Sequence, residues 1–192
     1  MKTTREAIIQ TAVRMFKEHG AENVSVDMIC KECGITKGSF YHHFSSKDDI
    51  FLGYWDYASA PAKGVLEIAD SDISPKEKLR KIMNIGIDAA VNEMGQAAMG
   101  SFWKVDIAHG NEILSPFGFI EGKSFSEEIS SYIVNLIKTA HKNGEIKSDR
   151  NPKDLLLTYY AAVMGISVNW STSGATYNVI DYLNTVFDVV FD

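Results

Sequence analysis

The feature that most constrains this chain is a pair of very short helical segments joined by a tight turn. Segments 26–33 and 37–43 each follow a hydroxyl residue that can cap a helix, Ser25 and Thr36, and Gly34 ends the first of them. Helices of about eight residues are not stable alone in water, so both must pack against longer neighbours. A pair held in this way is the plan of a helix-turn-helix unit.

The flanking segments provide those longer neighbours. Apolar residues at helical spacing predict a first helix from about Thr3 to His19, and Gly20 ends it. Ser45-Ser46 followed by Asp48-Asp49 predicts overlapping capping boxes at the start of a fourth helix, with Asp in place of the usual Glu. In such a unit the second short helix enters the DNA major groove by its N-terminal residues.

Candidate base contacts therefore lie at the start of the second short helix. Lysine favours guanine acceptors and hydroxyls read bases loosely, which makes Lys37, Ser39 and Thr36 the candidates for base readout. Gly38 costs about 1 kcal/mol of helix stability relative to Ala. We interpret this glycine as a site where the helix approaches the duplex closely.

Candidate phosphate contacts follow one turn later. Tyr41 and His42 can donate hydrogen bonds to phosphates, and Lys47 adds a positive charge near the fourth helix. Of His42 and His43, we expect one to contact DNA and the other to pack or to cap a helix. The complete predicted DNA-binding set is Ser25, Val26, Thr36, Lys37, Gly38, Ser39, Tyr41, His42, His43 and Lys47.

From Ile50 onward the segments become longer and more apolar, and we place a domain boundary here, within a continuous helix. The predicted domains are residues 1–48 and 49–192.

Pro61 is expected to bend or end the helix that crosses this boundary. Start and stop signals predict further helices at residues 74–94, 97–108, 125–140, 151–170 and 177–191, with a loop at 109–122. No segment alternates with period two, so the expected fold is all-α with about nine helices, a three-helix N-terminal domain preceding a helical C-terminal domain.

Charge is distributed unevenly between the two parts. Residues 1–50 contain equal numbers of acidic and basic side chains, so residues 51–192 carry the entire net charge of -6. The acidic part of the chain, residues 51–192, repels phosphate. This leaves the N-terminal domain as the surface for nucleic acid.

From the sequence we expect neither export nor a membrane-spanning segment. Residues 1–6 are polar, and the longest nearly apolar run, 155–168, is shorter than the roughly 20 residues that span a bilayer. Only two cysteines occur, Cys30 and Cys33, which fits a reducing cytoplasm. Their spacing puts both on one face of a short helix, where we expect core packing, and we expect no metal site and no cofactor.

The run from Ser25 to Ile50, above all Gly34-Ile35-Thr36-Lys37-Gly38-Ser39-Phe40-Tyr41-His42-His43-Phe44, closely resembles the TetR/AcrR family of repressors. The family's Lys, Gly, Tyr, His, Phe, Ser and Lys are in register, and Cys33 stands where Ala is usual. The resemblance covers about the first quarter of the chain. It implies a DNA-binding transcriptional repressor, not an enzyme, that binds a palindromic operator as a homodimer and is modulated by a small-molecule effector in the C-terminal domain.

The resemblance also implies that the last two helices form a four-helix bundle with their symmetry mates. The helix that contains Leu155 is apolar around most of its circumference, more than one intramolecular face requires, which agrees with this expectation. Gly165 would let two helices cross closely. The predicted interface residues are Leu156, Tyr159, Tyr160, Val163, Gly165, Ile166, Trp170, Ile180, Leu183 and Phe187.

The resemblance further implies that a ligand in the C-terminal domain changes the distance between the two N-terminal domains of the dimer, and that the fourth helix transmits this change. Aromatic and methionine side chains make adaptable apolar pockets. On this basis the candidate lining is Trp55, Met83, Met94, Met99, Phe102, Trp103 and Phe117.

Two alternatives remain open at this point. One is a helical enzyme or small-molecule carrier in which the head serves only assembly, and turnover without operator binding would favour it. The other is a thiol-based sensor in the same DNA-binding frame, which would depend on Cys30 and Cys33.

Overall fold

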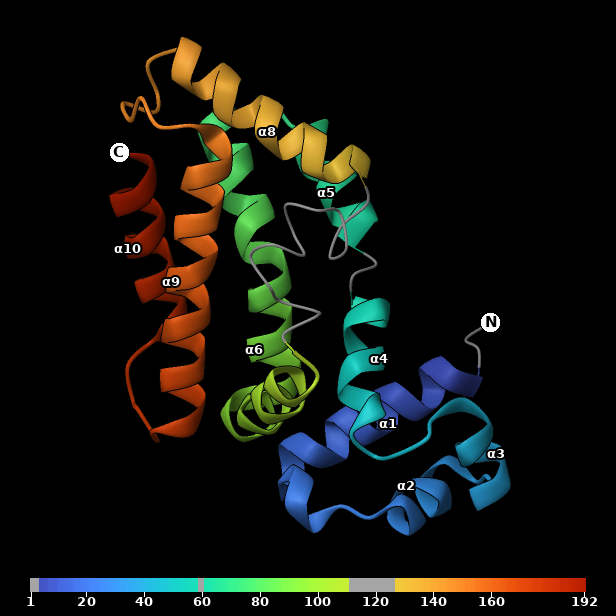
Figure 1. Ribbon diagram of the computed structural model, residues 1–192. Helices are drawn as coiled ribbons and strands as arrows, with labels where there is room; N and C mark the ends of the chain where they lie inside the picture. The colour runs from blue at the N-terminus through green and yellow to red at the C-terminus, as the bar shows by residue number, and fades with distance from the viewer. Residues whose placement is uncertain (1–3, 59–60, 111–126) are drawn as a thin grey trace.

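The computed structural model describes residues 4–58, 61–110 and 127–192. Within these ranges it contains nine α-helices, one short 3-10 helix and no strand. The all-α fold class predicted from the sequence is therefore confirmed. Figure 1 shows a small N-terminal head at one end of a longer helical body.

The head is built from helices that pack around α1 (Figure 1). Its elements are α1 (Thr4–His19), η1 (Ala21–Asn23), α2 (Val26–Cys33), α3 (Lys37–His43) and α4 (Asp49–Ala58). The bounds of α2 and α3 are those predicted from the capping residues. Short-range start and stop signals determine these helices, because each signal acts on backbone groups within four residues.

Side-chain caps hold the ends of the short helices. Ser25 Oγ accepts a hydrogen bond from Met28 N at 3.2 Å, and Thr36 Oγ1 accepts one from Ser39 N at 3.1 Å. Gly34 closes α2 with a left-handed φ of 65°. The predicted caps are thus confirmed, and they satisfy amide groups that a short helix would otherwise leave exposed.

A reciprocal capping box precedes α4. Asp49 N donates to Ser46 Oγ at 3.2 Å, while the Asp49 carboxylate accepts from Ser45 N at 2.8 Å and from Ser46 N at 3.2 Å. Burial acts to raise the pKa of Asp49, but the hydrogen bonds to its charged form, above all the one from Ser46 Oγ at 2.8 Å, lower it. Aspartate therefore replaces glutamate in this box without loss of the reciprocal bonds.

The body consists of five further helices (Figure 1). They are α5 (Pro61–Ala69), α6 (Pro75–Ala108), α8 (Glu127–Lys142), α9 (Pro152–Thr172) and α10 (Val179–Phe191). Helices α9 and α10 pack against each other, and α6 runs beside them. Pro61 begins α5, as expected of a residue that interrupts the preceding helix. Of the predicted loop at 109–122, only the turn at residues 109–110 lies within the described residues.

Helix α6 changes direction at Gly95, which has φ 73° and ψ 174°. The sequence predicts two helices here, at residues 74–94 and 97–108, and the structure has one long element with a break between the same two parts. A glycine adopts this backbone conformation at little cost. The break lets the two halves of α6 point in different directions and enter different cores.

Two hydrophobic cores result. The first contains the buried residues of α1 to α4 together with Met94, which lies just before the break, and Ala98, Met99, Phe102, Trp103 and Val105 from the second half of α6. The second contains the first half of α6 with α5, α8, α9 and α10. The second half of α6 is therefore part of the core of the head. Ile50, Phe51 and Tyr54 of α4 belong to the same core, although the predicted domain boundary lies before them.

Candidate nucleic-acid interface and ligand pocket

Helix α3 buries one face and exposes the other. Phe40 is completely buried and Phe44 nearly so, and both lie in the core of the head. Thr36, Lys37 and Gly38, at the start of the helix, are exposed. The helix lies at the outer edge of the head, away from α9 and α10 (Figure 1). The two phenylalanines thus anchor a short helix whose N-terminal residues face outward.

Gly38 is not required by packing within the chain. A Cβ atom built at this position would meet only Thr36 Oγ1, at an ordinary 3.7 Å. The helix gives up stability at this glycine without any internal contact that needs it. A close approach by another molecule would explain why the position has no side chain.

Lys37 forms an ion pair with a residue of the neighbouring helix. Its Nζ lies 2.7 Å from Asp27 Oδ1 of α2, and both side chains are largely exposed. The hydrogen bond to Asp27 raises the pKa of Lys37. Sequence reasoning did not find this partner, because nothing in the spacing of residues 27 and 37 indicates that they meet. To contact DNA, the Lys37 ammonium group would have to leave Asp27 or to donate hydrogen bonds to both Asp27 and the DNA.

The aromatic residues of α3 differ in exposure. Tyr41 is 54% exposed, and its ring meets Phe40 edge-on at 5.4 Å between centroids. His42 is exposed and His43 is half-buried, with their ring centroids 5.1 Å apart. Tyr41 and His42 are therefore the two residues of this turn that are open to a phosphate.

Lys47 is used inside the head. Its Nζ donates to the carbonyl oxygens of Ala21 at 2.6 Å and Val24 at 2.9 Å. The ammonium group ties the start of α4 to the segment between η1 and α2. It is less available for the predicted phosphate contact than the exposed residues of α3. Of the other two predicted residues, Ser25 is an exposed cap and Val26 is half-buried against the core.

The two cysteines contribute to packing. Cys30 is buried in the core of the head and Cys33 packs against that core, and both thiols are free. Burial is the main cause that raises the pKa of the Cys30 thiol. A raised pKa disfavours the reactive thiolate.

Five of the residues predicted to line a ligand pocket are buried in the described part of the chain. Met94, Met99, Phe102 and Trp103 lie in the core shared with the head, and Met83 lies in the second core, where its Sδ is 3.5 Å from the Tyr160 hydroxyl. The side chain of Trp55 and all of Phe117 lie outside the described residues.

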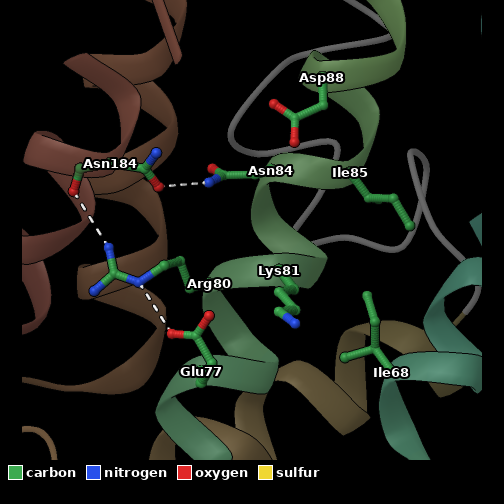
Figure 2. Close-up of a pocket in the computed structure, with 8 residues that line it drawn as sticks. All are labelled: Ile68, Glu77, Arg80, Lys81, Asn84, Ile85, Asp88 and Asn184. Atoms are coloured by element: carbon green, nitrogen blue, oxygen red, sulfur yellow. Dashed lines mark hydrogen bonds and ion pairs between the residues drawn. The ribbon is translucent and has the colours of Figure 1, made fainter. Parts of the chain in front are cut away.

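A pocket of about 650 Å³ lies elsewhere, between α5, α6 and α10. Its lining is polar and includes only two apolar side chains; the residues are Ile68, Glu77, Arg80, Lys81, Asn84, Ile85, Asp88 and Asn184 (Figure 2). Residues 77, 80, 81, 84, 85 and 88 all come from α6. Their helical spacing could have suggested a shared face, but the pocket becomes apparent only once α5 and α10 are in place.

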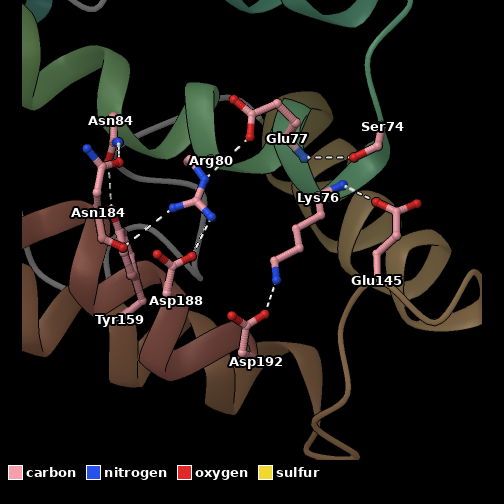
Figure 3. A network of polar contacts seen from close by, with 10 residues as sticks. All are labelled: Ser74, Lys76, Glu77, Arg80, Asn84, Glu145, Tyr159, Asn184, Asp188 and Asp192. Carbon is pink, nitrogen blue, oxygen red and sulfur yellow. Dashed lines mark hydrogen bonds and ion pairs between the residues drawn. The ribbon is translucent and has the colours of Figure 1, made fainter.

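A hydrogen-bonded network runs along one wall of this pocket (Figure 3). Tyr159 of α9 donates to Asn84 Oδ1 at 2.9 Å, and Asn84 Nδ2 donates to Asn184 Oδ1 of α10 at 2.9 Å. Arg80 forms ion pairs with Asp188 of α10 and with Glu77 of α6, the latter at 3.4 Å. The network connects α6 to both α9 and α10. Burial raises the pKa of Tyr159, so its phenol remains a proton donor in this network.

The residues predicted at the dimer interface fall into two groups. Five are buried within the chain's own second core and so face other helices of the same chain; they are Leu156, Tyr159, Val163, Leu183 and Phe187. The other five are half-buried or exposed; they are Tyr160, Gly165, Ile166, Trp170 and Ile180. In addition, α10 exposes Tyr182 and Val189, by 52% and 78%. The second group and these two side chains can offer surface to a partner.

No helix in the described parts of the chain has the length and apolar character needed to cross a membrane. The same residues include no cluster of three or more side chains suited to bind a metal ion.

The capped pair α2 and α3, with the second helix facing outward from a small head, has the arrangement of a helix-turn-helix unit of the class that binds DNA. The family model described as bacterial regulatory proteins of the tetR family matches residues 8–54. This match covers the head, about a quarter of the chain, and shows what that part of the chain is similar to.

Individual relatives match different shares of the chain. An uncharacterised HTH-type regulator of Bacillus subtilis, YerO, is 34% identical over 84 residues, which are 42% of this chain and 29% of that protein. The regulator AcrR of Shigella flexneri is 26% identical over 175 residues, covering 87% of this chain and 78% of AcrR. The match with YerO thus spans less than a third of that protein.

A solved structure shares the fold of nearly the whole chain. FadR of Thermus thermophilus, described as a TetR family transcriptional repressor in complex with lauroyl-CoA, superposes with a TM-score of 0.59 and is 14% identical. The superposition covers 97% of this chain and 92% of FadR. At this identity the likeness concerns the fold.

Proposed function

We propose that this protein is a cytoplasmic transcriptional repressor that binds a palindromic operator as a homodimer and is released or recruited by a small-molecule effector. The observation that carries the proposal is the outward face of α3, where Lys37, Gly38 and Tyr41 are exposed over the buried anchors Phe40 and Phe44. Contacts from such a helix to base edges and phosphates are the means by which helix-turn-helix proteins read DNA. We propose no catalytic activity.

The division of the chain follows from the same proposal. Residues 1–48 would hold the DNA-reading unit and residues 49–192 the effector and dimerisation helices. The proposed DNA contacts are the predicted set, led by Thr36, Lys37, Gly38, Ser39 and Tyr41. Two such heads, held by one dimer, would read half-sites about 34–36 Å apart or a multiple of that distance.

Dimerisation through α9 and α10 is supported by the apolar side chains that remain open there. Tyr182 and Val189 are exposed on α10, and Gly165 is exposed on α9. Exposed apolar surface of this kind is typical of an interface with a partner. A second copy would cover it and would bring two heads to one side of the molecule.

Two connections support the proposed response to an effector. Helix α4 leads from the core of the head into the body, and the second half of α6 is itself part of that core. The first half of α6 lines the pocket. A ligand that binds better to one arrangement of α6 would therefore also favour one position of the head. FadR, with its bound lauroyl-CoA, is an example of a family member that holds a small molecule.

The experiment that tests DNA binding begins with selection of duplexes from a random library by the purified protein. We expect a palindromic consensus. Replacing Lys37 with Ala should then weaken binding to that duplex by about 1–3 kcal/mol, since a lysine contact to a base edge has this magnitude. Tyr41→Phe should weaken it by about 0.5–1.5 kcal/mol, the contribution of one neutral hydrogen bond.

The matched control is Lys138→Ala, which removes an equal charge from the exposed face of α8. Its affinity should equal that of the wild type, and circular dichroism should show all three variants folded. If Lys37→Ala and Tyr41→Phe bind the duplex as tightly as the control, the proposed reading face is wrong.

A further inference from the structure

The pocket in Figure 2 contains one carboxylate, Asp88, with an oxygen that has no hydrogen-bond partner among the described residues. Asp88 Oδ1 is buried and has no hydrogen-bond partner. The other polar groups on the wall are engaged: Arg80 pairs with two acids, and Asn84 bonds to both Tyr159 and Asn184. Of the two acidic residues in the lining, Glu77 pairs with Arg80, so Asp88 is the acidic residue that is left for a ligand.

An unpartnered carboxylate in this position lowers the stability of the folded chain. Desolvation disfavours the charged form, and burial raises the pKa of Asp88 for this reason. Native proteins keep few buried polar atoms without a partner, and those that remain call for an explanation such as a ligand. A cationic group placed against Asp88 would provide the missing partner and favour the charged form.

The rest of the pocket fits an organic cation better than an inorganic one. Ile68 of α5 and Ile85 of α6 provide an apolar wall on the side of the pocket away from Asn184 (Figure 2). A volume of about 650 Å³ lies in the range that accommodates small organic ligands. A ligand with a hydrocarbon part and a charged end could use both features at once.

The same lining offers weaker electrostatic attraction to an anionic ligand. The Arg80 guanidinium is already neutralised by Glu77 and Asp188, and it lies over the Phe187 ring at 4.3 Å. Lys81, the second basic residue of the lining, is exposed to solvent. An anion would therefore have a solvated ammonium as its main attraction, and it would be repelled by Asp88.

We propose that this pocket binds an organic ammonium compound, with the charged nitrogen at Asp88 and the hydrocarbon part against Ile68 and Ile85. The inference rests on the proposed function, since it names the chemical class of the effector. The pocket shares Asn84 and Asn184 with the network that joins α6 to α9 and α10. The bound compound would thus contact the residues that connect the body's helices.

Three probes of equal chain length test the proposal: octylammonium, octanoate and 1-octanol, with binding measured by isothermal titration calorimetry on the full chain without DNA. We expect octylammonium to bind the wild type more tightly than either of the other two. Asp88→Asn keeps the shape of the side chain and removes its charge. It should weaken octylammonium binding by about tenfold or more, because it removes a charge-assisted hydrogen bond, and should leave 1-octanol unchanged.

The matched control is Glu67→Gln, which removes one acidic charge from the exposed face of α5 outside the pocket lining. It should bind octylammonium as the wild type does. Asp88→Asn should remain folded and should melt at an equal or higher temperature at neutral pH without ligand, because the unpartnered charge is gone. A lower melting temperature would contradict the premise that Asp88 is unsatisfied.

Three results would overturn the proposal: equal affinity of octylammonium for the wild type and Asp88→Asn, tighter binding of octanoate than of octylammonium, or no binding of octylammonium to the wild type. The proposed function is tested separately by the affinity for the selected duplex with and without octylammonium. Binding through Asp88 without any change in DNA affinity would leave the cation site in place and contradict its role as the effector site.

Discussion

At Gly38 we expect the same substitution to raise the stability of the fold and to weaken DNA binding. Its surroundings leave room for a methyl group, with only Thr36 Oγ1 near at 3.7 Å. Gly38→Ala should therefore raise the free energy of unfolding by up to about 1 kcal/mol, the difference in helix propensity between the two residues. The same methyl group would stand between α3 and the duplex and should weaken operator binding.

Two measurements on Gly38→Ala check this prediction: urea denaturation for stability and fluorescence anisotropy with a labelled duplex for binding. A variant that is more stable and binds DNA as tightly as the wild type would show that this face of α3 does not approach DNA closely. A less stable variant would mean that the glycine is needed for the fold of the head.

At the scale of elements, the contact between α6 and α9 depends on Gly100. A Cβ atom at this position would lie 2.9 Å from the Ser171 carbonyl oxygen. A backbone atom cannot swing away as the end of a side chain can, so one of the helices would have to move. We expect Gly100→Ala to lower the free energy of unfolding by about 1–3 kcal/mol, as overpacking does, despite the gain in helix propensity.

Urea denaturation of Gly100→Ala measures this effect directly. Because α6 also belongs to the core of the head, we expect the loss of packing to reduce DNA affinity as well. A gain in stability would indicate that α6 and α9 lie further apart in solution than in the structure.

At the scale of the whole molecule, Gly165 tests where two copies of the chain meet. Gly165 is exposed on α9, and a Cβ atom there would have no neighbour within 4 Å in its own chain. The isolated subunit should tolerate Gly165→Ala easily. If two helices cross at this residue, the methyl groups would separate them, and we expect dimer dissociation at a protein concentration about tenfold higher or more than for the wild type.

Sedimentation equilibrium on Gly165→Ala measures the change. Ser131→Ala, on the exposed face of α8, is the control and should dimerise as the wild type does. Equal dimerisation of the two variants would place the interface away from this part of α9.

Much of the candidate reading unit could be predicted because its signals are local. The caps Ser25 and Thr36, the left-handed Gly34 and the box at Ser46 and Asp49 all act on backbone groups one turn away. Such short-range preferences are present in the sequence whatever the rest of the chain does. They were sufficient to place α2 and α3 and to indicate which end of α3 faces outward.

Contacts between distant residues could not be predicted in the same way. The ion pair of Lys37 with Asp27 and the bonds from Lys47 to two backbone carbonyls depend on how the helices of the head cross. The methionine and aromatic residues chosen as pocket lining include five in the cores, because the same apolar character suits both places.

The sequence by itself determined the helices, the break near Gly95 and the helix-turn-helix unit, since periodicity, caps and glycines operate over a few residues. Only the tertiary structure decided which apolar faces are buried within one chain and where a cavity remains. The pocket combines Ile68 and residues of α6 with Asn184, which lies more than a hundred positions after Ile68. Their meeting depends on the packing of whole helices, and local preferences contain no information about it.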